Sequence, residues 1–228
     1  MGRGERYGYG VATLISIVLV VGALSHRLEF DITEVLGFVS GALCVWLTVK
    51  ENVWNFPISI ANNIFFIVLF LQARLFADTG LQVVYIVLEI LGWYWWLRGG
   101  HNRTALVVGR TTALTAGFLT VLGIACTVAM TVFLTSIADS APFWDALTTV
   151  LSLIAQYMLT RKLLENWYVW MTADVIYVAL YIYKGLYLTT VLYGVFFVMC
   201  IAGILHWRRS ERAAHGLLKA PQPEANVA

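Results

Sequence analysis

Aromatic, acidic and amide side chains recur at helical spacing inside three strongly apolar segments of the chain. The first stripe, over residues 164–183, consists of Trp167, Trp170, Asp174, Tyr177 and Tyr181. The second, over residues 79–97, consists of Gln82, Tyr85, Glu89, Trp93 and Trp96. A third stripe consists of Asn55, Ser59 and Asn62. Residues three and four apart share one face of an α-helix, so each stripe places its polar groups side by side.

A carboxylate among indole and phenol rings suits a flat ligand that is aromatic and either cationic or amide-bearing. Rings stack on indoles, and a positive charge is attracted both by ring faces and by carboxylates. A phosphorylated ligand would call for Arg or Lys in the apolar core, and the segments carry none there. We therefore predict eight substrate-binding residues: Asn62, Gln82, Tyr85, Glu89, Trp167, Trp170, Asp174 and Tyr177.

Structural roles compete with binding for several of these side chains. Trp and Tyr collect at membrane interfaces as anchors, which is the interpretation that we favour for four residues at segment ends: Trp95, Trp96, Trp144 and Trp207. Asn and Ser stripes also hold helices together. Asp174 and Glu89 lie well inside their segments, with no Lys or Arg one turn away. Because an acidic group within a membrane is costly, it favours a functional role.

The composition predicts an integral membrane protein. Of the 228 residues, 60% are hydrophobic and only 12% are charged, and the mean hydropathy is +0.78. A soluble domain is roughly half apolar and about a quarter charged. A bilayer core about 30 Å thick requires roughly 20 mostly apolar residues per helix, and the chain supplies such runs repeatedly.

We predict an all-α membrane protein with eight transmembrane helices. Their expected ranges are 9–24, 32–49, 57–76, 79–97, 112–136, 143–160, 164–183 and 187–207. Strands of a membrane barrel would alternate apolar and polar residues, whereas these runs are apolar on every side. The chain therefore favours helices over a barrel.

Two parts of the chain resemble each other at an offset of 111 residues. The matching pairs include Glu34 with Asp145, Lys50 with Arg161, Asn55 with Asn166, Gly92 with Gly203 and Trp96 with Trp207. The pattern predicts two parallel three-helix repeats, residues 32–98 and 142–208, joined by a linker loop and helix at 99–141. Transporters with such repeats bind their substrate near the midplane, between the halves. Residues 1–31 then form an extra N-terminal helix, and residues 209–228 a disordered cytoplasmic tail.

The distribution of Lys and Arg predicts the orientation, because basic loops resist translocation. With the N-terminus inside, the inside segments hold Arg3, Arg6, Lys50, Arg98, Arg103, Arg110, Arg161, Lys162, Arg208, Arg209, Arg212 and Lys219. The outside loops hold only Arg27, Arg74 and Lys184. We therefore expect a multi-pass protein of the cell (inner) membrane with both termini cytoplasmic. The basic residues form no single patch, so nucleic acid is not an expected partner.

Enzymatic and metal-binding patterns are absent from the sequence. The histidines lie at loops or segment ends, without HExxH spacing, and no GxSxG elbow or phosphate-binding loop occurs. The three cysteines, Cys44, Cys126 and Cys200, lie far apart and lack metal-site spacing. We predict that the chain is not an enzyme and needs neither a cofactor nor a metal.

The sequence resembles the PnuC family of nicotinamide riboside transporters. The resemblance rests on the stretch 142–170, with its core TRKLLENWYVW, and on the stretch 62–96, with its GWYWW ending; with the spacing it covers the chain from about Glu34 to Trp207. It implies a seven-helix core of two three-helix halves joined by a linker helix, similar to the SWEET sugar transporters. The helix at 9–24 lies outside that core.

The resemblance further implies a homotrimer and facilitated diffusion of nicotinamide riboside, with trapping by cytoplasmic phosphorylation. Relatives of the family carry thiamine, riboflavin or deoxynucleosides. Glu89 and Asp174 favour a cationic ring, and hence nicotinamide riboside or thiamine over riboflavin. A non-transporting membrane receptor or assembly factor with the same scaffold is the alternative of a different class.

Overall fold

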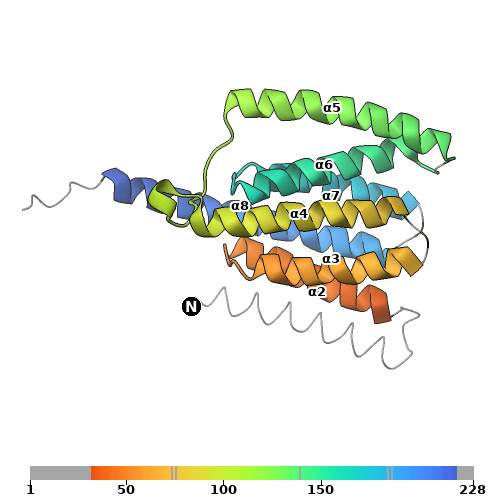
Figure 1. The fold of residues 1–228 in the computed structure, drawn as a ribbon, viewed down its shortest axis with the longest axis horizontal. Coiled ribbons are helices and arrows are strands. Elements are labelled where there is room, and N and C mark those ends of the chain that lie inside the picture. The colour runs from red at the N-terminus through yellow and green to blue at the C-terminus, as the bar shows by residue number, and fades with distance from the viewer. Residues whose placement is uncertain are drawn as a thin grey trace, which may run out of the picture.

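A computed structural model describes residues 32–219 of the chain, apart from residues 73, 75, 139, 184 and 186. The described residues fold into seven α-helices and one short 3₁₀ turn, without a β-strand (Figure 1). The helices are α2 (Ile32–Val49), α3 (Asn55–Gln72), α4 (Phe76–Arg98), α5 (Ala113–Ser136), α6 (Pro142–Thr160), α7 (Asn166–Tyr183) and α8 (Tyr187–Lys219), with the 3₁₀ turn at His101–Arg103. The all-helical class is thus confirmed. The helix expected at 9–24 lies outside the described residues.

Long apolar helices show that this is a multi-pass membrane protein. Four described segments are long and apolar enough to cross a bilayer: Asn55–Gln72, Asp78–Arg98, Ala113–Ser136 and Thr190–Ala214. Large apolar side chains also cover the outer surface of the bundle; on α5, Leu114 and Phe118 are more than half exposed. Apolar patches of this extent are rare on soluble monomers, whereas lipid tails cover them at no cost.

The helices run along one common axis, with α5 beside α6 at one side and α2 and α3 at the other (Figure 1). We call the two predicted repeats, residues 32–98 and 142–208, the two halves. In the first half α3 packs on α4, and in the second α7 packs on α8. Between the halves, α2 contacts α8 and α4 contacts α6. The interface between residues 32–98 and 142–208 is therefore built from helices at equivalent positions of the two repeats that the sequence predicts.

The 111-residue offset reappears in the helix boundaries. Helices α3 and α7 begin at residues 55 and 166, α4 and α8 begin at 76 and 187, and α2 and α6 end at 49 and 160. The residues that follow α2 and α6 match as well, because Glu51 and Lys162 both adopt the left-handed conformation with φ of 54°. The two segments thus share both their sequence pattern and their turns.

Aromatic packing repeats in the same way at one end of the bundle. The ring of Phe56 meets Trp96 edge-on at 5.1 Å, and the ring of Trp167 meets Trp207 edge-on at 5.3 Å. Trp96 and Trp207 each form a hydrogen bond with the other half. Nε1 of Trp96 donates to the Leu159 carbonyl, and Nε1 of Trp207 donates to the Thr48 carbonyl, both at 3.1 Å. These rings lie in the main hydrophobic core.

Two structural predictions made from the sequence are wrong. Trp96 and Trp207 are buried, so their interpretation as interface anchors is wrong; their N–H groups find carbonyl partners between the halves instead. The predicted disorder from residue 209 is also wrong as far as residue 219, because α8 continues to Lys219. Arg110 stabilises this extension by donating to both carboxylate oxygens of Glu211, at 2.5 and 2.8 Å. Residues 220–228 lie outside the described residues.

Gly203 allows the closest approach of α7 and α8. A Cβ atom at this position would lie 2.4–2.6 Å from the indole of Trp167. We expect Gly203→Ala to destabilise the protein by about 1–3 kcal/mol, because the ring must move within a packed core. Thermal unfolding of the purified protein measures the change. Gly117→Ala on α5, where a Cβ meets nothing within 4 Å, is the matched control. It should raise stability slightly, by about 0.5–1 kcal/mol, because Ala is the better helix former; equal losses in both variants would contradict the prediction.

Candidate functional site

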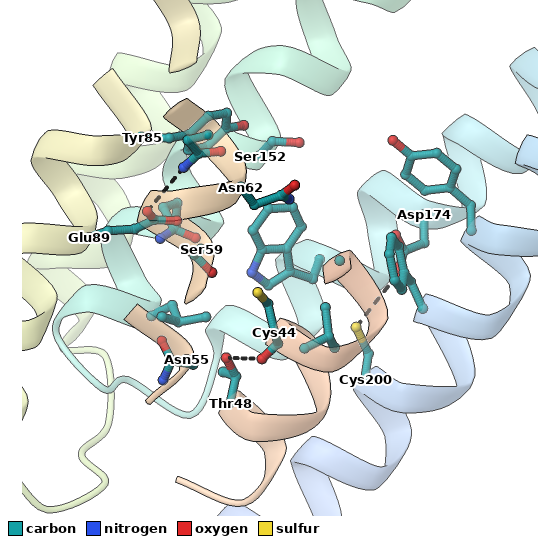
Figure 2. A pocket seen from close by; sticks show the side chains of 18 of the residues that line it. Cys44, Thr48, Asn55, Ser59, Asn62, Tyr85, Glu89, Ser152, Asp174 and Cys200 are labelled. Atoms are coloured by element: carbon teal, nitrogen blue, oxygen red, sulfur yellow. Dashed lines mark hydrogen bonds between the residues drawn. The ribbon is translucent and has the colours of Figure 1, made fainter. Parts of the chain in front are cut away.

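A cavity of about 410 Å³ lies between the two halves and is lined by α2, α3, α4, α6, α7 and α8 (Figure 2). All eight residues predicted from the sequence line it: Asn62, Gln82, Tyr85, Glu89, Trp167, Trp170, Asp174 and Tyr177. The structure therefore brings together the polar faces of three helices that are up to 115 positions apart in the chain. Their part in ligand binding stays a prediction.

Most of the cavity wall consists of positions that are equivalent in the two repeats. Nine pairs of lining residues stand 111 positions apart: Gly41 and Ser152, Val45 and Gln156, Thr48 and Leu159, Ser59 and Trp170, Asn63 and Asp174, Phe66 and Tyr177, Gln82 and Tyr193, Tyr85 and Phe196, Glu89 and Cys200. The cavity thus lies between the two halves and is lined by equivalent positions of both. This is where a substrate site is expected in a repeat transporter.

The wall formed by α3 and α4 is rich in amide, hydroxyl and carboxylate groups. Asn63 Nδ2 donates to Glu89 Oε2 at 3.0 Å, and Ser40 Oγ donates to Asn62 Oδ1 at 3.1 Å. Glu89 is only 6% exposed, and Figure 2 shows it beside Tyr85 and Ser59. This side of the cavity can both donate hydrogen bonds to a polar ligand and accept them from it.

The opposite wall, formed by α7 and α8, is mainly aromatic. Trp170 and Tyr177 of α7 line the cavity together with Tyr193 of α8, whose ring centroid lies 4.4 Å from that of Tyr177. Asp174 lies on this wall, is 3% exposed and accepts a hydrogen bond from Cys200 Sγ at 3.5 Å. A thiol is a weak donor, so among the described residues most of the hydrogen-bonding capacity of the Asp174 carboxylate is unused.

Neither carboxylate is paired with a basic side chain among the described residues. Nor do the described lining residues include Lys, Arg or His. An uncompensated buried carboxylate is unfavourable unless its charge is offset. The cavity is therefore suited to a ligand that carries positive charge and hydrogen-bond donors.

Some stripe residues lie elsewhere, and several wall residues were missed. Trp93 is 38% exposed and Trp96 belongs to the core, while Tyr181 stacks on Tyr177. The contribution of α8, chiefly Tyr193, Phe196 and Cys200, was not predicted from the sequence. The segment 187–207 has no polar stripe that would reveal its inner face. The repeat was the available signal, since Tyr193 is the equivalent of Gln82 and Cys200 that of Glu89.

One part of the cavity wall borders the hydrophobic core. Leu159 and Trp167 belong both to the cavity wall and to that core. Beyond them, Lys162 Nζ forms a 2.9 Å ion pair with Glu51 Oε2, donates to the Leu106 carbonyl at 2.9 Å and lies 4.7 Å from the ring centroid of Trp96. Glu51 and Lys162 occupy equivalent positions, so the two repeats are joined here by an ion pair.

A second cavity, of about 680 Å³, lies between α5 and α6 and is almost entirely apolar. It contains none of the predicted binding residues. Its carboxylate, Glu165, is already engaged by the backbone and hydroxyl groups of Thr111, both at 2.8 Å. The polar cavity between the halves is therefore the better candidate for a site.

Comparisons with known proteins identify membrane transporters as relatives of this chain. A family model described as "Nicotinamide mononucleotide transporter" matches residues 31–209. The nicotinamide riboside transporter PnuC of Escherichia coli (strain K12) is 30% identical, over 87% of this chain and 93% of that protein. The riboflavin/roseoflavin transporter RibM of Streptomyces davaonensis is 22% identical, over 82% and 90%. A crystal structure of the vitamin B3 transporter PnuC has the same fold, with a TM-score of 0.72 at 15% identity, over 93% and 94% of the two chains.

Proposed function

We propose that this protein, which belongs to the nicotinamide mononucleotide transporter family, carries nicotinamide riboside across the membrane by facilitated diffusion. The observation that carries the proposal is the cavity between the repeats, in which two buried carboxylates and several aromatic rings surround a space without a basic side chain among the described residues. A pyridinium ring offers the matching positive charge and flat face. The family is that of membrane transporters, so the chain is not an enzyme.

The chemistry of the cavity favours the riboside over its phosphate. A phosphate group needs Arg or Lys partners, whereas this wall presents Glu89 and Asp174. Phosphorylation in the cytoplasm would then convert the riboside into a product that the cavity repels. Metabolic trapping of this kind drives net uptake without an energy source in the transporter itself.

Riboflavin is the second candidate substrate, because RibM is named as a riboflavin/roseoflavin transporter. Its ring system is flat but uncharged. Two carboxylates on opposite walls favour a cation, so nicotinamide riboside comes first and thiamine, which is also cationic, fits the same argument.

For the whole assembly we propose eight helices, in which two parallel three-helix repeats flank the linker helix α5 and one further helix precedes α2. The recurrence of helix ends and of cavity residues at 111 positions supports the repeats. A homotrimer in the inner membrane is proposed from the resemblance of the sequence alone.

Uptake into proteoliposomes tests the function. Vesicles that contain the purified protein and, inside, a nicotinamide riboside kinase with ATP should accumulate label from radioactive nicotinamide riboside. Vesicles without the kinase should only equilibrate. A membrane receptor that does not transport would give protein-free background in both cases, and faster uptake of riboflavin than of nicotinamide riboside would favour the second candidate.

The same vesicles test whether transport is uncoupled. No Lys, Arg or His among the described residues lines the cavity, so coupling to protons would have to run through Glu89 or Asp174. We expect the initial uptake rate to stay within about twofold when ionophores collapse the proton or sodium gradient. Loss of uptake under these conditions, with the kinase still active, would show that transport is coupled to an ion.

The distribution of basic residues predicts that both termini are cytoplasmic. Fusions of a reporter that is active only in the cytoplasm, placed after Gly4 and after Ala220, should both be active. A periplasmic reporter that became active at either position would show the opposite orientation.

A further inference from the structure

Inside the cavity, each repeat joins its second helix to its third by one side-chain hydrogen bond. In the first repeat, Asn63 of α3 donates to Glu89 of α4 at 3.0 Å; in the second, Cys200 of α8 donates to Asp174 of α7 at 3.5 Å. The two bonds are equivalent, because residues 63 and 174, and residues 89 and 200, stand 111 positions apart. The acid, however, lies on the third helix of one repeat and on the second helix of the other.

Because the acids lie on different helices of their repeats, the two carboxylates have different surroundings. Figure 2 shows Glu89 and Asp174 on opposite sides of the cavity. Glu89 lies with the amides and hydroxyls of α3, whereas Asp174 lies on the wall that holds most of the aromatic side chains: Trp167, Trp170, Tyr177, Tyr193 and Phe196. The wall formed by α3 and α4 is thus suited to a polar group rich in hydroxyls, and the wall formed by α7 and α8 to a ring.

We propose that Glu89 recognises the vicinal hydroxyls of the sugar, while the cationic ring lies against Trp170 and Asp174. This inference rests on the proposed function and assigns the orientation of that substrate. An ionised carboxylate can accept hydrogen bonds from two neighbouring hydroxyls, and bonds to a charged acceptor are the stronger ones.

Asn63 acts as a positioning residue for Glu89. By donating to Oε2 it fixes the rotation of the carboxylate and leaves Oε1 without a hydrogen bond among the described residues. Asn62 lies one position earlier, and its Oδ1 already accepts from Ser40. Its amide nitrogen is therefore the group that can donate to a sugar oxygen, so that acceptor and donor stand together on this wall.

The different positions of the two acids add to the other differences between the two walls, and together these select one orientation of the ligand. With the acid on the same helix in both repeats, a ligand turned end over end would meet a carboxylate at the equivalent place. Here the turned ligand would place its ring among amides and its hydroxyls against indole and phenol faces. Specificity arises because this second orientation leaves polar groups unpaired.

Calorimetric titration of the purified full-length protein with three ligands tests the assignment. The ligands are nicotinamide riboside, its 2′,3′-dideoxy analogue, which keeps the charged ring, and the reduced riboside, which keeps the sugar but has an uncharged ring. For Glu89→Gln we expect the preference for the riboside over the dideoxy analogue to fall by roughly tenfold to a hundredfold, as for loss of a hydrogen bond to a charged group. The affinity for the dideoxy analogue should change much less.

Asp174→Asn is the matched control, and it should give the converse result. Its preference for the riboside over the dideoxy analogue should be kept, while the preference for the charged over the reduced ring falls. If Glu89→Gln loses affinity for nicotinamide riboside and for the dideoxy analogue by the same factor, the assignment is overturned. The proposed function stands in that case, because the wild type still binds nicotinamide riboside. Failure of the wild type to bind nicotinamide riboside instead overturns the proposed function, and the assignment with it.

Asn63→Ala supplies the same test if Glu89→Gln does not purify as a single species. It keeps the carboxylate but removes the donor that orients it, so the preference for the riboside over the dideoxy analogue should fall by at least about threefold. An unchanged preference in a variant with the wild-type melting temperature overturns the assignment. A purely structural role of Asn63 would lower the melting temperature and leave the preference unchanged.

Discussion

Trp170→Ala should lower the affinity for nicotinamide riboside roughly tenfold to a hundredfold. The indole lines the aromatic wall one turn from Asp174, where it can stack on the pyridinium ring. Loss of a stacked aromatic partner costs about 1–3 kcal/mol, by analogy with bases that stack on aromatic side chains. Calorimetric titration of the purified, monodisperse variant measures the change, and Trp170→Phe, which keeps a ring face, should recover part of the loss.

Trp144→Ala is the control for this prediction. Trp144 is 49% exposed on α6 and does not line the cavity, so its loss should leave the affinity within about twofold. If Trp170 only holds helices together, Trp170→Ala should instead lower the melting temperature and leave the affinity unchanged. That outcome would remove Trp170 from the binding site.

The membrane-spanning segments could be predicted because one physical quantity, the thickness of the bilayer, sets the length of every apolar run. The segment 32–49 agrees at both ends with α2, and 112–136 differs from α5 by one residue. The end of α8 could not be found in this way. Beyond Trp207 the chain is polar, and tertiary contacts such as those of Arg110 with Glu211 and of Arg208 with Tyr168 stabilise the continued helix.

The eight candidate residues met in one cavity because helical periodicity decides which side chains share a face. Periodicity does not decide what a face meets. Trp93 and Trp96 belong to the same predicted stripe, yet one is exposed and the other buried. The cavity residues of α8 could not be recognised either, since Phe196 and Cys200 differ in no visible way from the apolar residues that face lipid. Packing between the repeats makes that distinction, and it is a tertiary property.

The ion pair between Glu51 and Lys162 is expected to make the largest single contribution to the stability of the region beside the hydrophobic core. The two side chains are 16% and 9% exposed, and their charged groups lie 2.9 Å apart. Removing one partner of a buried pair costs about 3–5 kcal/mol, because the other charge loses its main compensation. In Lys162→Met, Glu51 would keep only the longer contact with His206, whose Nε2 lies 4.0 Å from Glu51 Oε1. Lys162→Met should therefore lower the free energy of unfolding by that amount, measured by denaturant titration in mixed micelles.

Arg161→Met is the control for Lys162→Met. The guanidinium of Arg161 lies 4.6 Å from the ring centroid of Trp95 but is exposed, so its loss should cost less than about 1 kcal/mol. If both variants lost the same free energy of unfolding, the ion pair with Glu51 would contribute no more to stability than the exposed contact of Arg161.

Exchange of the two charges tests whether the pair itself, rather than either residue, provides this stability. Glu51 and Lys162 occupy equivalent positions with the same backbone conformation, so Glu51→Lys combined with Lys162→Glu places each side chain in the setting of the other. The double variant should recover more than half of the loss caused by Lys162→Met. It should not recover all of it, because the bond from Lys162 to the Leu106 carbonyl and its contact with Trp96 are lost. Additive losses from the two single substitutions would instead show that the two charges act independently of each other.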